Sequence, residues 1–312
     1  SDWIELYNAT GTSIDIGGWF LSDSQNNPFK YQLPDGTTIG PYTYLVFRQD
    51  WHFGNANAPG CYEPFALSED GDEVYLSSAQ NGVLTGYREV EDFGASATGV
   101  SLGRFYKAST DSYNFVAMEQ STPGFANAGA KVGPIVINEI MYHPDWPVGG
   151  SYTNDQYEYI ELLNISGAPV TLYDYNAGEP WRFTDGIEFT FPDNPPPTIP
   201  AGRCLLVVQE PAAFLWRYPA VPAEQVLGPY DGKLSNAGES LELSMPGDVD
   251  EEGKRYYIRV DRINYSDGSD PKDLWPAEAD GRGQSLTRRV AGSYGNDPAN
   301  WQSAAPTPGA KR

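Results

Sequence analysis

The sequence is poor in cysteine, histidine and methionine, with 2, 2 and 3 residues of these types among 312. Two cysteines, Cys61 and Cys204, are too few for a disulfide scaffold, and the sequence leaves open whether they pair. Two histidines leave little for a zinc site. No apolar run approaches the ~18 residues that a membrane-spanning helix needs, so membrane insertion is not expected.

Positive charge is also scarce, since 20 Lys and Arg face 42 Asp and Glu, for a formal net charge of -22. A surface of this sign repels phosphate groups, which argues against nucleic-acid binding. An apolar helical period never persists beyond about two turns. Short alternating apolar blocks between the 33 Gly and 26 Pro predict an all-β chain instead. No signal-peptide pattern lies at residue 1, so we expect a processed or cut start.

The chain contains a tandem repeat. The strand pattern DQYEYIELLN, residues 155–164, returns at the N-terminus as SDWIELYN, residues 1–8. Later blocks recur in the same order, and the insertions of the second copy fall in Gly-, Pro- and Asp-rich segments typical of surface loops. Because the chain is too long for one sandwich core, we expect two domains, 1–126 and 135–312, with a short linker at 127–134.

The second copy opens with an apolar strand, IVINEIM at Ile135–Met141, that has no counterpart in the first copy. A sandwich that lacks a strand exposes unpaired backbone groups, which proteins normally cover. Two explanations stay open. Residues upstream of Ser1 are missing, which is the favoured explanation, or the chain is a subunit of an extracellular filament-like assembly in which a neighbour donates a strand.

The ordered blocks VINEIMYHP, YEYIELLN, LSNAGESLEL, ADGRGQSLTRR and PTPG, with DWIELYN, IGGWFLSD, LSEDGDEVYL and STPGFAN in the first copy, resemble the lamin tail domain family in its secreted bacterial form. The resemblance implies two tandem immunoglobulin-like β-sandwiches, the first apparently lacking its opening strand. It implies no catalytic residues and a secreted or cell-surface location. The implied function is a structural or binding module that presents loops, with other domains of the same exported protein or neighbouring subunits as partners.

Catalytic chemistry has little support among the residues. His52 and His143 occupy unrelated positions in the two copies, and neither adjoins a Ser-containing elbow. Glu5 and Glu161 recur at one strand position, and Arg104 and Arg288 recur in a later block. Because a partly buried carboxylate needs a partner, we predict the structural pairs Glu5 with Arg104 and Glu161 with Arg288.

Calcium is the one cofactor that the sequence suggests. Calcium prefers oxygen ligands from loops, and acidic loops are present, although none fits the EF-hand pattern. Solvated acidic loops are the simpler interpretation. The candidate ligands are Asp70, Asp72, Asp248, Asp250, Glu252, Asp267 and Asp270.

Aromatic loops suggest carbohydrate binding as an alternative function, because exposed indole rings stack on sugars. The candidate ligand residues of this carbohydrate or surface adhesion module are Trp146, Trp181 and Trp275. Asn8, Asn164 and Asn264 stand in glycosylation sequons. The recurrence of the first two is explained more simply by an Asn that caps the turn after its strand.

Overall fold

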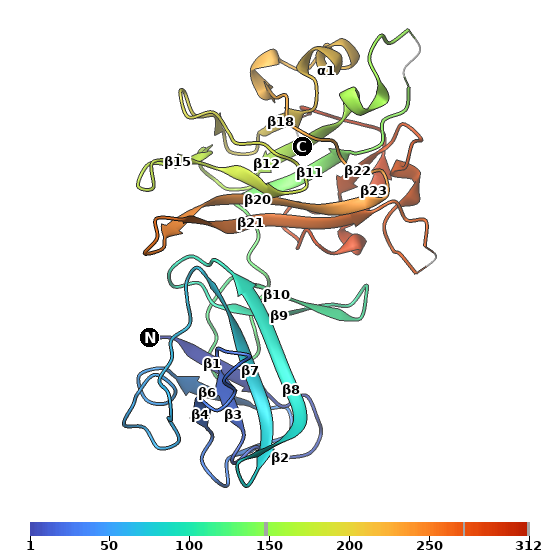
Figure 1. Cartoon of the computed structure of the whole chain (residues 1–312). Helices are drawn as coiled ribbons and strands as arrows, with labels where there is room; N and C mark the ends of the chain where they lie inside the picture. The colour runs from blue at the N-terminus through green and yellow to red at the C-terminus, as the bar shows by residue number, and fades with distance from the viewer. Residues whose placement is uncertain (147–148, 271, 311–312) are drawn as a thin grey trace. The chain divides into compact units, whose positions relative to one another are not determined.

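The structure is a computed structural model that describes residues 1–146, 149–270 and 272–310. Its contacts divide the chain into two compact units (Figure 1). Unit 1 contains Ser1–Phe105 and Asn114–Ala130, and unit 2 contains Tyr106–Tyr113 and Lys131–Arg312. Strands hold about 40% of the residues and helices 7%, which confirms the predicted all-β class. Among the described residues, no helix is long and apolar enough to cross a membrane.

Most of the N-terminal strands are short, and two longer ones form a hairpin. They are β1 (Trp3–Tyr7), β2 (Ile14–Asp15), β3 (Phe20–Ser22), β4 (Tyr31–Gln32), β5 (Thr38–Ile39), β6 (Tyr44–Arg48), β7 (Gly71–Gln80), β8 (Val83–Gly94), β9 (Leu102–Lys107) and β10 (Ser112–Ala117). They form a four-stranded sheet, β4-β3-β7-β8, and the two-stranded sheets β1-β6, β9-β10 and β2-β5. Packed between the four-stranded sheet and β1-β6 is a core that contains Ile4, Leu21, Tyr31, Leu33 and Phe47.

The long hairpin of β7 and β8 turns at Asn81 and Gly82, which have φ angles of 53° and 75°. Two left-handed residues in succession give a hairpin turn whose twist matches that of the flanking strands. Asn and Gly are the residues that tolerate this conformation best, so the local sequence fixes the hairpin.

Unit 2 is larger and more deeply buried. Its elements are β11 (Ile135–Met141), η1 (Asn154–Tyr157), β12 (Tyr159–Asn164), β13 (Val170–Thr171), β14 (Tyr173–Asp174), β15 (Glu179–Pro180), β16 (Arg182–Asp185), β17 (Thr198–Ile199), β18 (Cys204–Val208), α1 (Pro211–Arg217), η2 (Ala223–Gln225), β19 (Val226–Leu227), β20 (Gly238–Val249), β21 (Arg255–Ser266), η3 (Ala277–Ala279), β22 (Ser285–Arg288), η4 (Pro298–Asn300) and β23 (Trp301–Ala304). Helix α1 starts with proline, and the Glu210 carboxylate caps it by accepting the Ala212 N–H.

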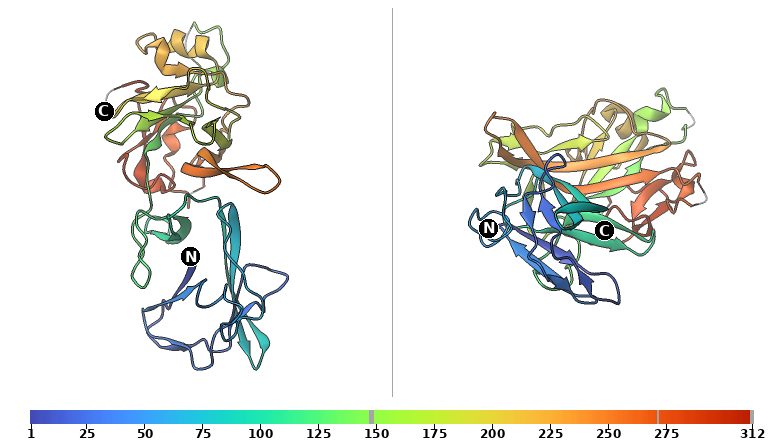
Figure 2. Two further views of the ribbon diagram at one scale, coloured as in Figure 1. Left: turned by 90° about the vertical axis from the view of Figure 1, so that its left-hand side faces the viewer. Right: turned by 60° about the horizontal axis from the view of Figure 1, so that its bottom comes forward.

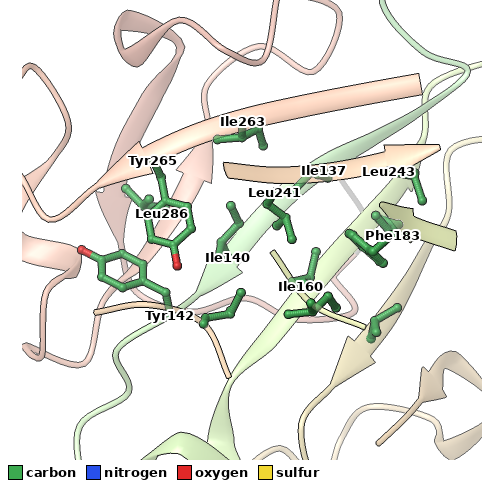
Figure 3. Close-up of a cluster of buried hydrophobic side chains, with 14 of the residues drawn as sticks. Ile137, Ile140, Tyr142, Ile160, Phe183, Leu241, Leu243, Ile263, Tyr265 and Leu286 are labelled. Atoms are coloured by element: carbon green, nitrogen blue, oxygen red, sulfur yellow. The ribbon is translucent and has the colours of Figure 1, made fainter. Parts of the chain in front are cut away.

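The unit 2 sandwich packs a six-stranded sheet against a three-stranded one. The six strands follow the order β19-β18-β12-β11-β22-β23, and the three follow β16-β20-β21, the last two forming a long orange hairpin (Figure 2). Figure 3 shows side chains of the larger sheet, such as Ile137, Ile140 and Ile160, meeting Leu241 and Ile263 of the smaller sheet. This interface is the core of unit 2.

Candidate functional site

Strand β11 lies at the centre of the unit 2 sheet, between β12 and β22 (Figure 1). It pairs antiparallel with both neighbours, and all of its residues are buried. Its register against β12 shifts between Ile137 and Glu139, which makes Asn138 the extra residue of a β-bulge. After the bulge, Glu139 lies opposite Glu161 of β12.

An ion pair holds the backbone at the bulge. The carboxylate of Asp261, on β21, accepts the Ile137 N–H at 2.8 Å. The guanidinium of Arg288, on β22, donates to the Ile137 carbonyl at 3.0 Å and to the same Asp261 oxygen at 2.7 Å. The side chains of Arg288 and Asp261 are only 0% and 7% exposed. Because the pair satisfies both polar groups of one residue, it ties β11 to the opposite sheet and to β22.

The two opposed glutamates hold the C-terminal TPG segment of unit 2. Glu139 accepts the Thr307 N–H at 2.9 Å and the Thr307 hydroxyl at 3.2 Å. Glu161 accepts the Gly309 N–H at 2.8 Å and the Asn138 amide at 2.7 Å. Two neighbouring buried carboxylates are tolerated because each accepts its own set of donors.

Unit 1 has the same neighbours but, in the described residues, no strand between them. By the repeat, β1 corresponds to β12, β6 to β18, and β9 and β10 to β22 and β23. The first pair and the second pair form separate two-stranded sheets, whereas β11 joins their counterparts in unit 2. We call the uncovered side of β1 the open edge.

The backbone of β1 offers hydrogen bonds at the open edge. The Asn8 N–H donates to Thr43, and the Asp2 carbonyl accepts from Gln49, so the polar groups of the even-numbered residues point toward β6. The backbone N–H and carbonyl groups of successive residues in a strand point to opposite edges, so those groups of Trp3, Glu5 and Tyr7 point to the open edge.

The apolar residues around the open edge are less buried than their counterparts in unit 2. Five half-buried side chains of unit 1 match buried ones in the second copy: Leu6 and Leu162, Leu45 and Leu205, Val74 and Leu241, Leu76 and Leu243, Leu102 and Leu286. Unit 1 therefore has an incompletely covered core on this side.

The ion pair of Asp261 and Arg288 has a counterpart in unit 1, where no strand of the described residues lies beside it. Glu89 lies opposite Leu76 on the β7-β8 hairpin, as Asp261 lies opposite Leu243 on β20-β21. Arg104 binds Glu89 at 2.8 Å and Glu91 at 2.5 Å. The Arg104 and Glu89 side chains are 45% and 42% exposed. The hydrogen bond from Arg104 lowers the pKa of Glu89.

The TPG contact also recurs. Glu5 accepts the Gly124 N–H at 2.5 Å, as Glu161 accepts that of Gly309. Burial raises the pKa of Glu5, and the Gly124 hydrogen bond partly offsets this. A repeated glutamate thus anchors the end of each unit to its sheet.

The predicted pairs of Glu5 with Arg104 and of Glu161 with Arg288 are therefore wrong. Each arginine binds an acid of the β7-β8 or β20-β21 hairpin, and each glutamate binds a backbone amide of TPG. The recurrence was visible in the sequence, but the partners depend on which hairpin packs against the late strand.

The acidic loops use their carboxylates to hold backbone turns. Asp72 accepts the N–H groups of Ser68 and Glu73, Asp250 those of Glu252 and Lys254, Asp267 that of Ser269 and Asp270 that of Lys272. Asp70 lies in the turn before β7, Asp248 lies near the end of β20, and residue 271 of the last loop lies outside the described residues. Within residues 1–146, 149–270 and 272–310, no group of three or more His, Cys, Asp or Glu side chains is arranged to hold a metal.

The candidate tryptophans have different environments. Trp181 and Trp275 are 6% and 8% exposed and belong to the unit 2 core, so their assignment to a sugar platform is wrong. Trp146 is 63% exposed. A buried ring cannot stack on a ligand, and the loop context in the sequence does not reveal that burial.

The remaining sequence candidates are structural. Asn8 and Asn164 are buried, and each donates to backbone carbonyls while accepting the N–H two residues later, which confirms the turn-capping interpretation. Asn264 is exposed. Cys61 and Cys204 are not joined by a disulfide. His52 packs against Tyr31 and Phe47, and His143 pairs with Asp280.

Sequence reasoning missed one buried acid, Glu158, which directly precedes β12. One carboxylate oxygen accepts the Tyr230 hydroxyl at 2.7 Å and the Leu234 N–H at 2.8 Å. The other oxygen is buried and accepts no hydrogen bond within the described part of the chain. Desolvation raises the pKa of Glu158 to about 8, although the two hydrogen bonds oppose the shift.

These packed, mainly antiparallel sheets define an immunoglobulin-like β-sandwich protein. Residues 1–91 match the model of the lamin tail domain family, which confirms the resemblance for that part of the chain. The family is generally non-catalytic, as befits a binding or structural module.

No curated protein matches the chain. Among solved structures, a DUF4876 family protein from Bacteroides thetaiotaomicron is similar over 98% of this chain and 96% of that chain, with a TM-score of 0.41 and 10% sequence identity.

The two arginines provide a matched test of burial. Arg288→Met should lower the free energy of unfolding by about 3–5 kcal/mol, because it leaves Asp261 as an unpaired buried charge. Arg104→Met should cost about 0–1 kcal/mol, because its ion pair is exposed to solvent. Chemical denaturation followed by circular dichroism measures both, and equal losses would contradict the difference in burial.

Glu158 should make the stability depend on pH. Below pH 4.5 both the folded and the unfolded states hold the proton; between 4.5 and about 8 only the folded state does, so stability should fall as pH rises through this window. Glu158→Gln should remove this slope and stabilise the protein at pH 8 by a few kcal/mol. Urea denaturation at pH 5, 6.5 and 8 measures it. The exposed Glu251→Gln is the control, and an unchanged slope in Glu158→Gln would refute the assignment.

Proposed function

We propose that the chain is a non-catalytic structural module of an exported or cell-surface protein, and that unit 1 binds a β-strand at the open edge of β1. The observation that carries this proposal is the comparison inside the chain. One unit contains a strand between the counterparts of β1 and β9, and the other has the same surroundings uncovered.

Strand addition suits this edge physically. Backbone groups of Trp3, Glu5 and Tyr7 supply the hydrogen bonds that an added strand requires, and the half-buried apolar side chains beneath supply area to bury. An exposed edge of this kind is an aggregation hazard unless it is covered. Uptake of a strand would remove the hazard and complete the sandwich.

The proposed location and the role of the loops rest on other grounds. The secreted or cell-surface assignment comes from the lamin tail resemblance together with the acidic composition. The long β7-β8 and β20-β21 hairpins give rigid sheets from which loops project, and the turn of β20-β21 is acidic. Neighbouring domains or subunits are the partners that such a module would join.

Strand uptake is tested with the peptide PIVINEIMY, residues 134–142, carrying terminal lysines for solubility. We expect saturable binding to the whole chain in a fluorescence anisotropy titration. Tyr7→Pro should abolish binding because it removes an N–H that faces the open edge and leaves the pairing with β6 unaltered.

Tyr7→Val is the matched control, because it also loses the ring but keeps the N–H, and it should bind the peptide as the unsubstituted chain does. Circular dichroism checks that both variants are folded. Equal binding by the Pro and Val variants, or no binding by the unsubstituted chain, would reject strand uptake at β1.

Carbohydrate binding is the second candidate function. A cavity in unit 1 favours it, whereas the buried tryptophans of the second copy do not. An open cavity of about 670 Å³ lies beside the turn of β7 and β8. Trp19 lines it and packs against Tyr87 with ring centroids 5.5 Å apart. An indole ring among amide, hydroxyl and carboxylate groups suits a sugar, and the polar side chains are Asp15, Gln32, Asp35, Gln80, Asn81 and Thr85.

A glycan array probed with the whole chain tests this candidate. We expect any glycan that binds to lose at least tenfold in affinity with Trp19→Ala, because stacking supplies much of the contact area. Trp51→Ala is the control, since Trp51 is exposed outside the cavity. Binding that survives Trp19→Ala would place the sugar elsewhere, and an array without binders would reject the candidate.

A further inference from the structure

The contacts of β11 in unit 2 specify which strand unit 1 would accept. We infer that the occupant of the open edge is a β-strand with a bulge. Arg104 and Glu89 bind the backbone of one of its residues, and a glutamate follows two residues later. This inference rests on the proposed strand uptake. The occupant is an extended peptide segment from outside residues 1–312.

A second copy of this chain is a poor donor. Its only segment with the required pattern among the described residues is β11, which is completely buried in its own unit 2. Donating it would leave the central position of a six-stranded sheet empty and expose the core on both sides. The segment must therefore come from elsewhere.

The first recognition element is the ion pair. In unit 2, Asp261 and Arg288 take the N–H and the carbonyl of Ile137. In unit 1, Glu89 and Arg104 hold the same positions on the hairpin and the late strand. Arg104 makes side-chain hydrogen bonds through Nε and Nη2 in the described residues, which leaves Nη1 to donate to an incoming carbonyl. The pair thus presents a donor and an acceptor to one residue of the added strand.

The second recognition element is Thr122 in the TPG segment. Its counterpart Thr307 donates both its N–H and its hydroxyl to Glu139. The adjacent contact is already in place in unit 1, where Gly124 donates to Glu5. In the described part of the chain, the Thr122 N–H and hydroxyl have no hydrogen-bond partner, so they are available to a carboxylate on the incoming strand. Two donors from one residue favour an ionised glutamate over its neutral amide.

The apolar pattern follows from the bulge. In unit 2, Ile137 and Ile140 both enter the core, two residues before and one residue after Glu139, because the extra residue Asn138 reverses the alternation (Figure 3). In unit 1, Leu76 and Leu102 are half-buried. Two apolar side chains of an added strand at the positions of Ile137 and Ile140 would cover them. A strand without the bulge would direct one of them to solvent.

The test uses the peptide PIVINEIMY, the same peptide with Glu139→Gln, and a third that lacks Asn138. We expect the Gln peptide to bind the whole chain at least tenfold more weakly and the peptide without the bulge to lose measurable binding. On the protein side, Thr122→Val should weaken the Glu peptide and abolish the difference between the Glu and Gln peptides. Arg104→Met should weaken all peptides, whereas the exposed Arg48→Met on β6 should change nothing.

The outcomes separate the two proposals. If the Glu and Gln peptides bind equally and Tyr7→Pro still abolishes binding, strand uptake stands and the glutamate inference is wrong. If no peptide binds, both are wrong. Analytical ultracentrifugation of the chain alone tests whether the added strand comes from a second copy. A stable dimer that no peptide displaces would identify a second copy as the occupant and overturn the inference.

Discussion

The constraint on which this structure depends is that a strand inside a sheet must satisfy its backbone on both edges while its side chains fill the core. Strand β11 meets it at the centre of unit 2, where β12 and β22 pair with its edges and Ile137 and Ile140 enter the sandwich. Where the bulge interrupts the pairing, Asp261 and Arg288 supply the missing partners. Burying that ion pair is tolerable because every charge has a partner.

Unit 1 shows what the same parts do without that strand. Its ion pair of Glu89 and Arg104 forms but remains in solvent, and its core leucines stay half-buried. The contact between Glu5 and the TPG segment survives, because it needs only β1 and the end of the unit. The TPG contact is therefore independent of the central strand, whereas the burial of the ion pair depends on it. This division is why the open edge looks preformed and not collapsed.

Much of the candidate site could be predicted from repeated residues. The absent counterpart of Ile135–Met141, the recurring Glu5 and Glu161, and the recurring Arg104 and Arg288 all belong to the open edge or to its filled equivalent. Their partners could not be predicted from the repeated blocks. Asp261 lies on a hairpin far from Arg288 in the sequence, and only the packing of that hairpin against β22 brings the two side chains together. The tryptophans misled for a similar reason, since Pro- and Gly-rich context marks a loop without saying which side of it faces the core.

By itself, the sequence determined the all-β class, the tandem repeat, the Asn-capped turns and the missing strand, because each depends on alternation or on residues close together in the chain. Only the tertiary structure decided which acid each arginine binds, that Trp181 and Trp275 are core residues, and that Glu158 is buried with a raised pKa. These depend on contacts between strands far apart in sequence, where packing of the two sheets sets distance and solvent exclusion. Identifying the open edge required both kinds of information. The repeat showed that the first copy has no counterpart of Ile135–Met141, and the fold showed which residues surround that position.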